Sequence, residues 1–126
     1  MSLIHTCYRI TEIDRSVSFY NALGFTEIGR IPIRDEAINV FMGLPDDGSV
    51  PRLELTYNIG HDEPYEIGTG YGHIAITTQD MDDALSRLKD QGIEPERPPY
   101  TIREGGPRLC FVQDPDGYRI ELIERG

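Results

Sequence analysis

The chain has 126 residues and a mass of 14.3 kDa, which is the size of one domain. Hydrophobic residues make up 38% and charged residues 27%, so the composition excludes a disordered or fibrous protein. With 12 Lys and Arg against 22 Asp and Glu, the net charge of −10 argues against nucleic acid or an anionic membrane surface as a partner.

The sequence also bears on where the protein works. No apolar run approaches the roughly 20 residues of a membrane-spanning helix. The first residues lack the basic start and apolar stretch of a signal peptide. Cys7 and Cys110 are the two cysteines. Without an export signal we expect them to be reduced, buried thiols of a cytoplasmic protein.

The chain repeats itself, and each half predicts the same order of elements. When the sequence is shifted so that His5 falls on His73, Gly24 falls on Gly92. Apolar spacing and turn residues predict in each half a strand, a helix that ends at the glycine, and three further strands. The predicted strands cover 3–10, 25–32, 37–42 and 52–57 in the first half, and 72–77, 93–96, 109–112 and 118–123 in the second. The sequence therefore predicts an α+β domain over 1–126, built of two βαβββ modules at about 1–60 and 70–126.

Each module contains one histidine and one glutamate at matching places. His5 and His73 lie in the first predicted strands, and Glu54 and Glu121 lie in the last ones. Each glutamate stands between apolar residues whose side chains point to the opposite face of the strand. A solvated carboxylate and a half-buried imidazole would explain any one of the four. The duplication favours a site for a divalent cation such as Ni²⁺, Co²⁺, Zn²⁺ or Fe²⁺.

These residues lie in segments that resemble the glyoxalase I family of the vicinal oxygen chelate superfamily, in its short bacterial form. The most specific segments are Glu-Leu-Thr-Tyr-Asn at 54–58 and Gly-His-Ile-Ala at 72–75. The Asp-Pro-Asp-Gly turn at 114–117 also matches, although it is common throughout the superfamily. The match extends over nearly the whole chain.

The resemblance implies a site and a reaction. The family's metal ligands fall on His5, Glu54, His73 and Glu121, and its members are homodimers whose sites draw ligands from both chains. The implied activity is lactoylglutathione lyase: isomerisation of the methylglyoxal–glutathione hemithioacetal to S-lactoylglutathione, with Ni²⁺ or Co²⁺ favoured and Zn²⁺ as a further candidate. By resemblance Glu121 is the leading base, and Glu54 is its near-symmetric counterpart.

Other residues match positions that hold glutathione in the family. They are Arg9 and Asn58, together with either Arg103 or Arg108, between which the sequence does not choose. The chain departs from the family pattern at Ile59, where a tryptophan is usual, and in the loop 101–107. These departures leave the identity of the thiol open.

Three other functions compete with this interpretation. Epimerases and dioxygenases of the superfamily use two histidines and one glutamate, and they usually lack a glutamate at the position of Glu54. Drug-sequestering dimers related to the bleomycin-resistance proteins generally lack all four ligands. A metal-binding structural protein without turnover is the third alternative, and an open, carboxylate-rich site argues against it.

Overall fold

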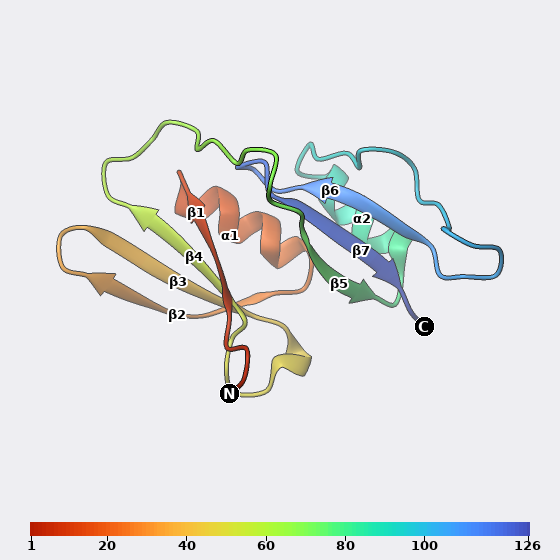
Figure 1. Cartoon of the computed structure of the whole chain (residues 1–126), viewed down its shortest axis with the longest axis horizontal. Helices are drawn as coiled ribbons and strands as arrows, with labels where there is room; N and C mark the ends of the chain where they lie inside the picture. The colour runs from red at the N-terminus through yellow and green to blue at the C-terminus, as the bar shows by residue number, and fades with distance from the viewer. The chain divides into compact units, whose positions relative to one another are not determined.

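The structure is a computed structural model that describes all 126 residues. It divides into two compact units, Met1–Glu66 and Ile67–Gly126 (Figure 1). Each unit packs one helix against one sheet, which confirms the predicted α+β class with two repeated modules. That the two units together form one domain stays a prediction. Neither helix has the length and apolar character needed to cross a membrane.

Unit 1 contains a four-stranded mixed sheet and one long helix. In chain order its elements are β1 (Thr6–Ile10), α1 (Ile13–Ala22), β2 (Thr26–Ile33), β3 (Ala37–Gly43), a short 3-10 helix (Pro45–Asp47) and β4 (Leu53–Asn58). The strands lie in the order β1-β4-β3-β2, with β1 parallel to β4 and the other pairs antiparallel. The first and last strands of the module are therefore neighbours, which brings residues about fifty positions apart in sequence onto adjacent strands.

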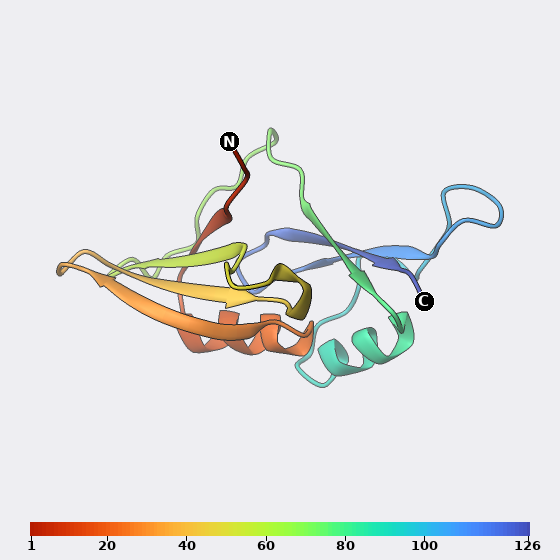
Figure 2. The same cartoon turned by 90° about the horizontal axis from the view of Figure 1, so that it is seen from below.

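The core of unit 1 lies between α1 and one face of the sheet (Figure 2). Leu53 and Leu55 of β4 are 1% and 0% exposed, whereas Glu54 between them points to the opposite face. From the helix side, Phe19 and Tyr20 are fully buried, and their rings meet edge to face at 4.9 Å. One face of the sheet thus packs into the core, and polar side chains such as that of Glu54 lie on the other face.

Unit 2 repeats this plan with one strand fewer. Its elements are β5 (Ile74–Thr78), α2 (Met81–Lys89), β6 (Leu109–Gln113) and β7 (Arg119–Glu124). The strand order is β5-β7-β6, with β5 parallel to β7 and β6 antiparallel to it. The buried residues again alternate with a glutamate, because Ile120 and Leu122 are fully buried on either side of Glu121.

Short-range hydrogen bonds fix the start of α2 and the turn between β6 and β7 in unit 2. Asp80 caps α2, since its side chain accepts a hydrogen bond from the backbone N–H of Asp83 at 2.9 Å. The turn between β6 and β7 is the predicted Asp-Pro-Asp-Gly segment. Its Gly117 has a φ of 94°, and its Asp114 accepts hydrogen bonds from the backbone of Asp116 and Tyr118 at 2.9 Å each.

One predicted strand and the starts of two others were wrong. The segment 93–96 is not a strand, although the backbone N–H of Glu96 still donates to the carbonyl of Phe111 at 2.8 Å. Pro95 lies within the segment, and Pro98 and Pro99 follow after Arg97. None of the three has an N–H to continue a ladder, so pairing resumes only as an isolated bridge at Tyr100. The first strands of the two modules begin at Thr6 and Ile74, later than predicted.

Candidate functional site

The first candidate pair lies on two parallel strands of unit 1. His5 directly precedes β1, and Glu54 is in β4. Cys7 is paired with Glu54 in the ladder, and His5 comes two residues before Cys7, so both side chains lie on the face away from the core. Nε2 of His5 is 3.7 Å from Oε1 of Glu54, and these side chains are 30% and 14% exposed.

The second pair repeats this arrangement in unit 2. His73 directly precedes β5, and Ala75, two residues later, is paired with Glu121 of β7. Nε2 of His73 is 3.1 Å from Oε1 of Glu121, and these side chains are 34% and 15% exposed. The register, the facing atoms and the exposure are thus closely similar in the two modules.

Each pair includes a phenylalanine that the sequence analysis missed. Phe41 is paired with Glu54, and its ring meets the ring of His5 edge-on at 6.2 Å between centroids. Phe111 is paired with Glu121 and meets His73 in the same way at 4.8 Å. Loops of different length separate these phenylalanines from the helices, so the shift that aligns the histidines does not align them. A separate alignment of β3 with β6 would have matched Phe41 to Phe111.

The two pairs have the donor chemistry of a metal site. An imidazole nitrogen and a carboxylate oxygen are suitable ligands for a borderline divalent cation, and partial exposure leaves room for substrate or water. Within either unit, the structure shows no group of three or more His, Cys, Asp or Glu side chains that could hold a metal ion. Each unit therefore provides half of the predicted four-ligand set. The assembly of His5, Glu54, His73 and Glu121 around one cation stays a prediction.

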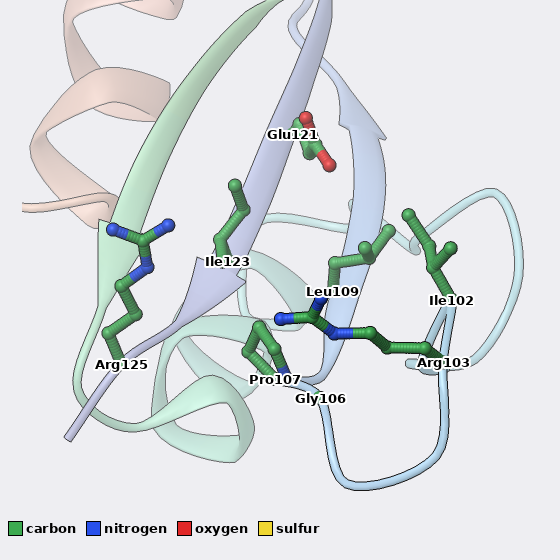
Figure 3. A pocket seen from close by; sticks show the side chains of 8 residues that line it. All are labelled: Ile102, Arg103, Gly106, Pro107, Leu109, Glu121, Ile123 and Arg125. Carbon is green, nitrogen blue, oxygen red and sulfur yellow. The ribbon is translucent and has the colours of Figure 1, made fainter.

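A cavity of about 300 Å³ adjoins the second pair (Figure 3). Glu121 and Ile123 of β7 form part of its wall, and Arg103 extends from the preceding loop toward Leu109 and Pro107. The remaining lining residues are Ile102, Gly106 and Arg125. The cavity thus combines a carboxylate, two guanidinium groups and apolar walls, and this combination suits an anionic molecule with an apolar part.

The cavity distinguishes between the two arginines that the sequence left open. Arg103 lines it, whereas Arg108 points elsewhere and binds Glu124 through two hydrogen bonds of 2.9 and 3.0 Å. Arg108 also lies 3.5 Å from Asp82. These acidic partners raise the pKa of the Arg108 guanidinium, with the Glu124 hydrogen bond as the largest cause. Arg108 is therefore engaged by acidic neighbours of its own unit, whereas Arg103 lines the cavity.

Asn58, at the end of β4, is held by neighbours that had no predicted role. Its Oδ1 accepts a hydrogen bond of 3.2 Å from the hydroxyl of Tyr65. The Tyr65 ring stacks on His61 at 4.1 Å, with an angle of 10° between the planes. His61 lies in the loop after β4, and its Nε2 atom is buried without a hydrogen-bond partner. This arrangement turns the NH₂ group of Asn58 away from Tyr65.

Arg9, the other residue predicted to hold glutathione, is exposed and shares the sheet face of Cys7.

The two cysteines are free thiols in different surroundings. Cys110 is buried as predicted, and burial raises the pKa of its thiol to about 11. Cys7 is exposed, which corrects the expectation that both are buried. The pKa of Cys7 is nevertheless raised, mainly because its sulfur is partly desolvated. Neither thiol is therefore activated as a nucleophile.

The repeated module of a strand, a helix and further strands, with a histidine and a glutamate at matching places in both copies, fits the vicinal oxygen chelate class of proteins. The chain belongs to the Glyoxalase/Bleomycin resistance protein/Dioxygenase superfamily, whose model matches residues 2–122. The resemblance on the motifs around Glu54 and His73 is thereby confirmed.

Curated relatives are similar to the chain over almost its whole length. A lactoylglutathione lyase of Haemophilus influenzae is 37% identical over 126 residues, covering 98% of this chain and 93% of that protein. A lactoylglutathione lyase of Arabidopsis thaliana is 39% identical over 125 residues, covering 98% of this chain and 44% of that protein. The chain thus spans less than half of the plant relative and nearly all of the bacterial one.

Solved structures agree with this relationship. The crystal structure of glyoxalase I from Zea mays superposes with a TM-score of 0.88 at 36% identity, covering 98% of this chain and 44% of that one. Glyoxalase I of Leishmania major, which is described as trypanothione-dependent, has a TM-score of 0.81 at 33% identity and covers 98% and 86%.

Proposed function

We propose that the protein is a lactoylglutathione lyase that converts the hemithioacetal of methylglyoxal and glutathione to S-lactoylglutathione. The observation that carries this proposal is the duplicated pair, His5 with Glu54 and His73 with Glu121, at 3.7 and 3.1 Å. The bacterial relatives of similar length, which bear the name lactoylglutathione lyase, support the same activity. We further propose that this reaction detoxifies methylglyoxal and that it takes place in the cytoplasm.

The four side chains would hold one divalent cation per complete site. The glyoxalase I family implies such a metal, and the imidazole and carboxylate donors described above fit it. We infer Ni²⁺ or Co²⁺ as the favoured ions, with Zn²⁺ as a further candidate. When bound, the cation supplies Lewis-acid stabilisation of negative charge on the oxygens of the substrate.

The proposed reaction moves protons and needs no oxidant. A carboxylate takes the proton from the substrate carbon that bears sulfur and hydroxyl, and returns it to the neighbouring carbonyl carbon. A second proton passes from the hydroxyl oxygen to the former carbonyl oxygen, which leaves a thioester and a new alcohol. Glu121 is the leading candidate for this base because it borders the cavity, and Glu54 is its counterpart in the other module.

The glutathione part of the substrate needs positive groups in a chain whose net charge is −10. Arg103 and Arg125 face the cavity, and each offers paired N–H donors to a carboxylate. Asn58 offers its NH₂ group, and Arg9 adds a charge on the sheet face of the first pair. Glutathione is the thiol that we propose. The trypanothione dependence of the Leishmania major relative makes other glutathione-like thiols the next to test.

A homodimer is part of the proposal because each unit provides only half of the ligand set. Two copies would supply two complete sites if the first pair of one copy met the second pair of the other. The partners would be the substrate and the second copy, with no role for nucleic acid or membrane.

A metal add-back assay tests the activity. The protein is stripped with a chelator, Ni²⁺, Co²⁺, Zn²⁺ or Fe²⁺ is restored singly, and conversion of the hemithioacetal is followed. We expect no turnover without metal and the fastest turnover with Ni²⁺ or Co²⁺. Tight metal binding without turnover under any metal would contradict the proposed substrate.

The Glu121→Gln variant tests the proposed base. Because the amide cannot accept the carbon-bound proton, we expect turnover to fall by at least about a hundredfold while the protein stays folded. Turnover is measured under the best metal, and the fold is checked by circular dichroism. Isomerisation at the parent rate would show that Glu121 is not the base.

A further inference from the structure

The two candidate glutamates differ in what holds the carboxylate oxygen that points away from the histidine. In unit 1, Oε2 of Glu54 accepts a hydrogen bond of 3.1 Å from the hydroxyl of Thr56. Thr56 lies two residues further along β4 and therefore on the same face of the sheet. The other oxygen, Oε1, is the one that lies 3.7 Å from Nε2 of His5. One oxygen is thus tied to the strand, and the other is presented beside the imidazole.

Neighbouring strands hold Thr56 itself in place. Its hydroxyl lies 3.0 Å from Oδ1 of Asn39, which is the residue opposite it on β3. It also lies 3.2 Å from the sulfur of Cys7, whose ladder partner is Glu54. The hydroxyl has a single proton to donate, and a carboxylate is a stronger acceptor than an amide oxygen. We therefore assign the proton to Glu54, and the hydroxyl oxygen can then accept a hydrogen bond from the S–H group of Cys7.

The second module has no such group. The residue two positions after Glu121 is Ile123, whose side chain lines the cavity and has no hydrogen bond to offer. The repeat therefore provides a comparison within one molecule. Glu54 and Glu121 have the same strand register, and each lies within 4 Å of a histidine. Only Glu54 has a hydroxyl group two residues further along its own strand.

We propose that Thr56 is a positioning residue that fixes Glu54 as a ligand through the single oxygen Oε1. This inference rests on the proposed function, because it takes Glu54 to be a metal ligand. Holding one oxygen removes rotational freedom from the carboxylate before the metal arrives and keeps Oε1 on the side of His5. Thr56 then contributes to metal affinity without touching the metal.

The test compares metal affinity rather than turnover, using the full-length protein. Thr56→Val removes the hydroxyl at nearly constant volume, and Thr56→Ser keeps it. Thr77→Val is the matched control, because Thr77 is an exposed threonine on β5 of the other module. Each apoprotein is titrated with Ni²⁺ and Co²⁺ against a chromophoric chelator, and circular dichroism verifies the fold.

We expect Thr56→Val to bind both ions about 10- to 100-fold more weakly than the parent, the range typical of lost partners of metal ligands. Thr56→Ser and Thr77→Val should bind within about twofold of the parent. If Thr56→Val fails to fold, Thr56→Ala lacks the hydroxyl without adding bulk and must show the same loss. Unchanged affinity in the hydroxyl-free variant, or an equal loss in Thr56→Ser, would overturn the inference. A parent protein that binds neither ion would overturn the proposed metal site itself, and this inference with it.

Discussion

At the scale of single residues, Arg103 and Arg108 carry the same charge in different surroundings. The guanidinium of Arg108 is bound by Glu124 and lies near Asp82, so its positive charge is already compensated. Arg103 lines the cavity beside Glu121. The role of each arginine therefore follows from its neighbours and not from its residue type.

We expect Arg103→Ala to raise KM for the hemithioacetal about tenfold, with a smaller effect on kcat. The reason is the loss of a hydrogen bond to a charged group, which contributes about 1.5 kcal/mol. Arg108→Ala is the control, and we expect it to lower the Tm while leaving KM unchanged. Steady-state kinetics and thermal unfolding of both variants measure this. The opposite pattern would exchange the roles of the two arginines.

Tyr65 offers a second test at this scale. Its hydroxyl donates to Oδ1 of Asn58, and the stacked ring of His61 holds the tyrosine in place. We expect Tyr65→Phe to raise KM about fivefold, because a net hydrogen bond of about 1 kcal/mol that orients the Asn58 amide is lost. Tyr100→Phe is the control, since the Tyr100 ring contacts Arg97 and lies outside this group. An unchanged KM in Tyr65→Phe would show that the orientation of Asn58 does not matter.

At the scale of elements, the end of β7 is connected to the start of α2 through Glu124. Its Oε2 accepts a hydrogen bond of 2.8 Å from the backbone N–H of Met81, and both of its oxygens accept from Arg108. Arg108 first, and Met81 second, lower the pKa of Glu124 from 4.5 to about 2. The carboxylate therefore stabilises both the terminal strand and the first turn of α2, where it adds to the cap that Asp80 provides.

This shift predicts the sign of one pH dependence. Because the pKa of Glu124 is lower in the folded state, its stabilising effect is complete above pH 4.5 and is lost as the pH falls toward about 2. We expect Glu124→Gln to lower the Tm at pH 7 and to flatten the fall of Tm on acidification. Glu94→Gln, at an exposed position, is the control. Parallel Tm profiles for the Glu124→Gln variant and the parent would contradict this.

At the scale of the whole molecule, each unit carries one pair of candidate ligands. The first pair comes from the meeting of β1 with β4, and the second from the meeting of β5 with β7. Completing a four-ligand site requires the two kinds of pair to face each other. The proposed homodimer would do this by joining the first pair of one copy to the second pair of the other.

Mixing two inactive variants tests the shared site. His5→Ala and Glu121→Gln each damage one pair, so we expect each dimer alone to be inactive. If sites are shared, a mixed dimer contains one fully intact site, and random mixing after partial unfolding restores roughly a quarter of the parent sites. Metal-dependent turnover of the mixture measures this. No recovery, in a mixture shown to contain mixed dimers, would contradict sharing between chains.

Much of the fold was predictable because its signals are local. The alternation around Glu54 and Glu121 assigned each glutamate to the face opposite the core, and the Asp-Pro-Asp-Gly turn placed the last hairpin. The strand at 93–96 was wrongly predicted because the repeat places a strand after each helix-ending glycine, whereas Pro95, Pro98 and Pro99 lack the N–H groups that a ladder needs. The choice between Arg103 and Arg108 could not be made, since the deciding partners lie on other elements.

The sequence by itself determined the repeated module, the four candidate ligands and the face on which each lies, because side-chain alternation and the internal repeat depend on positions along one chain. Only the tertiary structure decided which side chains meet. Strand register placed Phe41 and Phe111 against the pairs and Thr56 against Glu54. The physical reason is that hydrogen bonds and ring contacts between strands depend on pairing register and loop path, which the periodicity of a single strand does not contain.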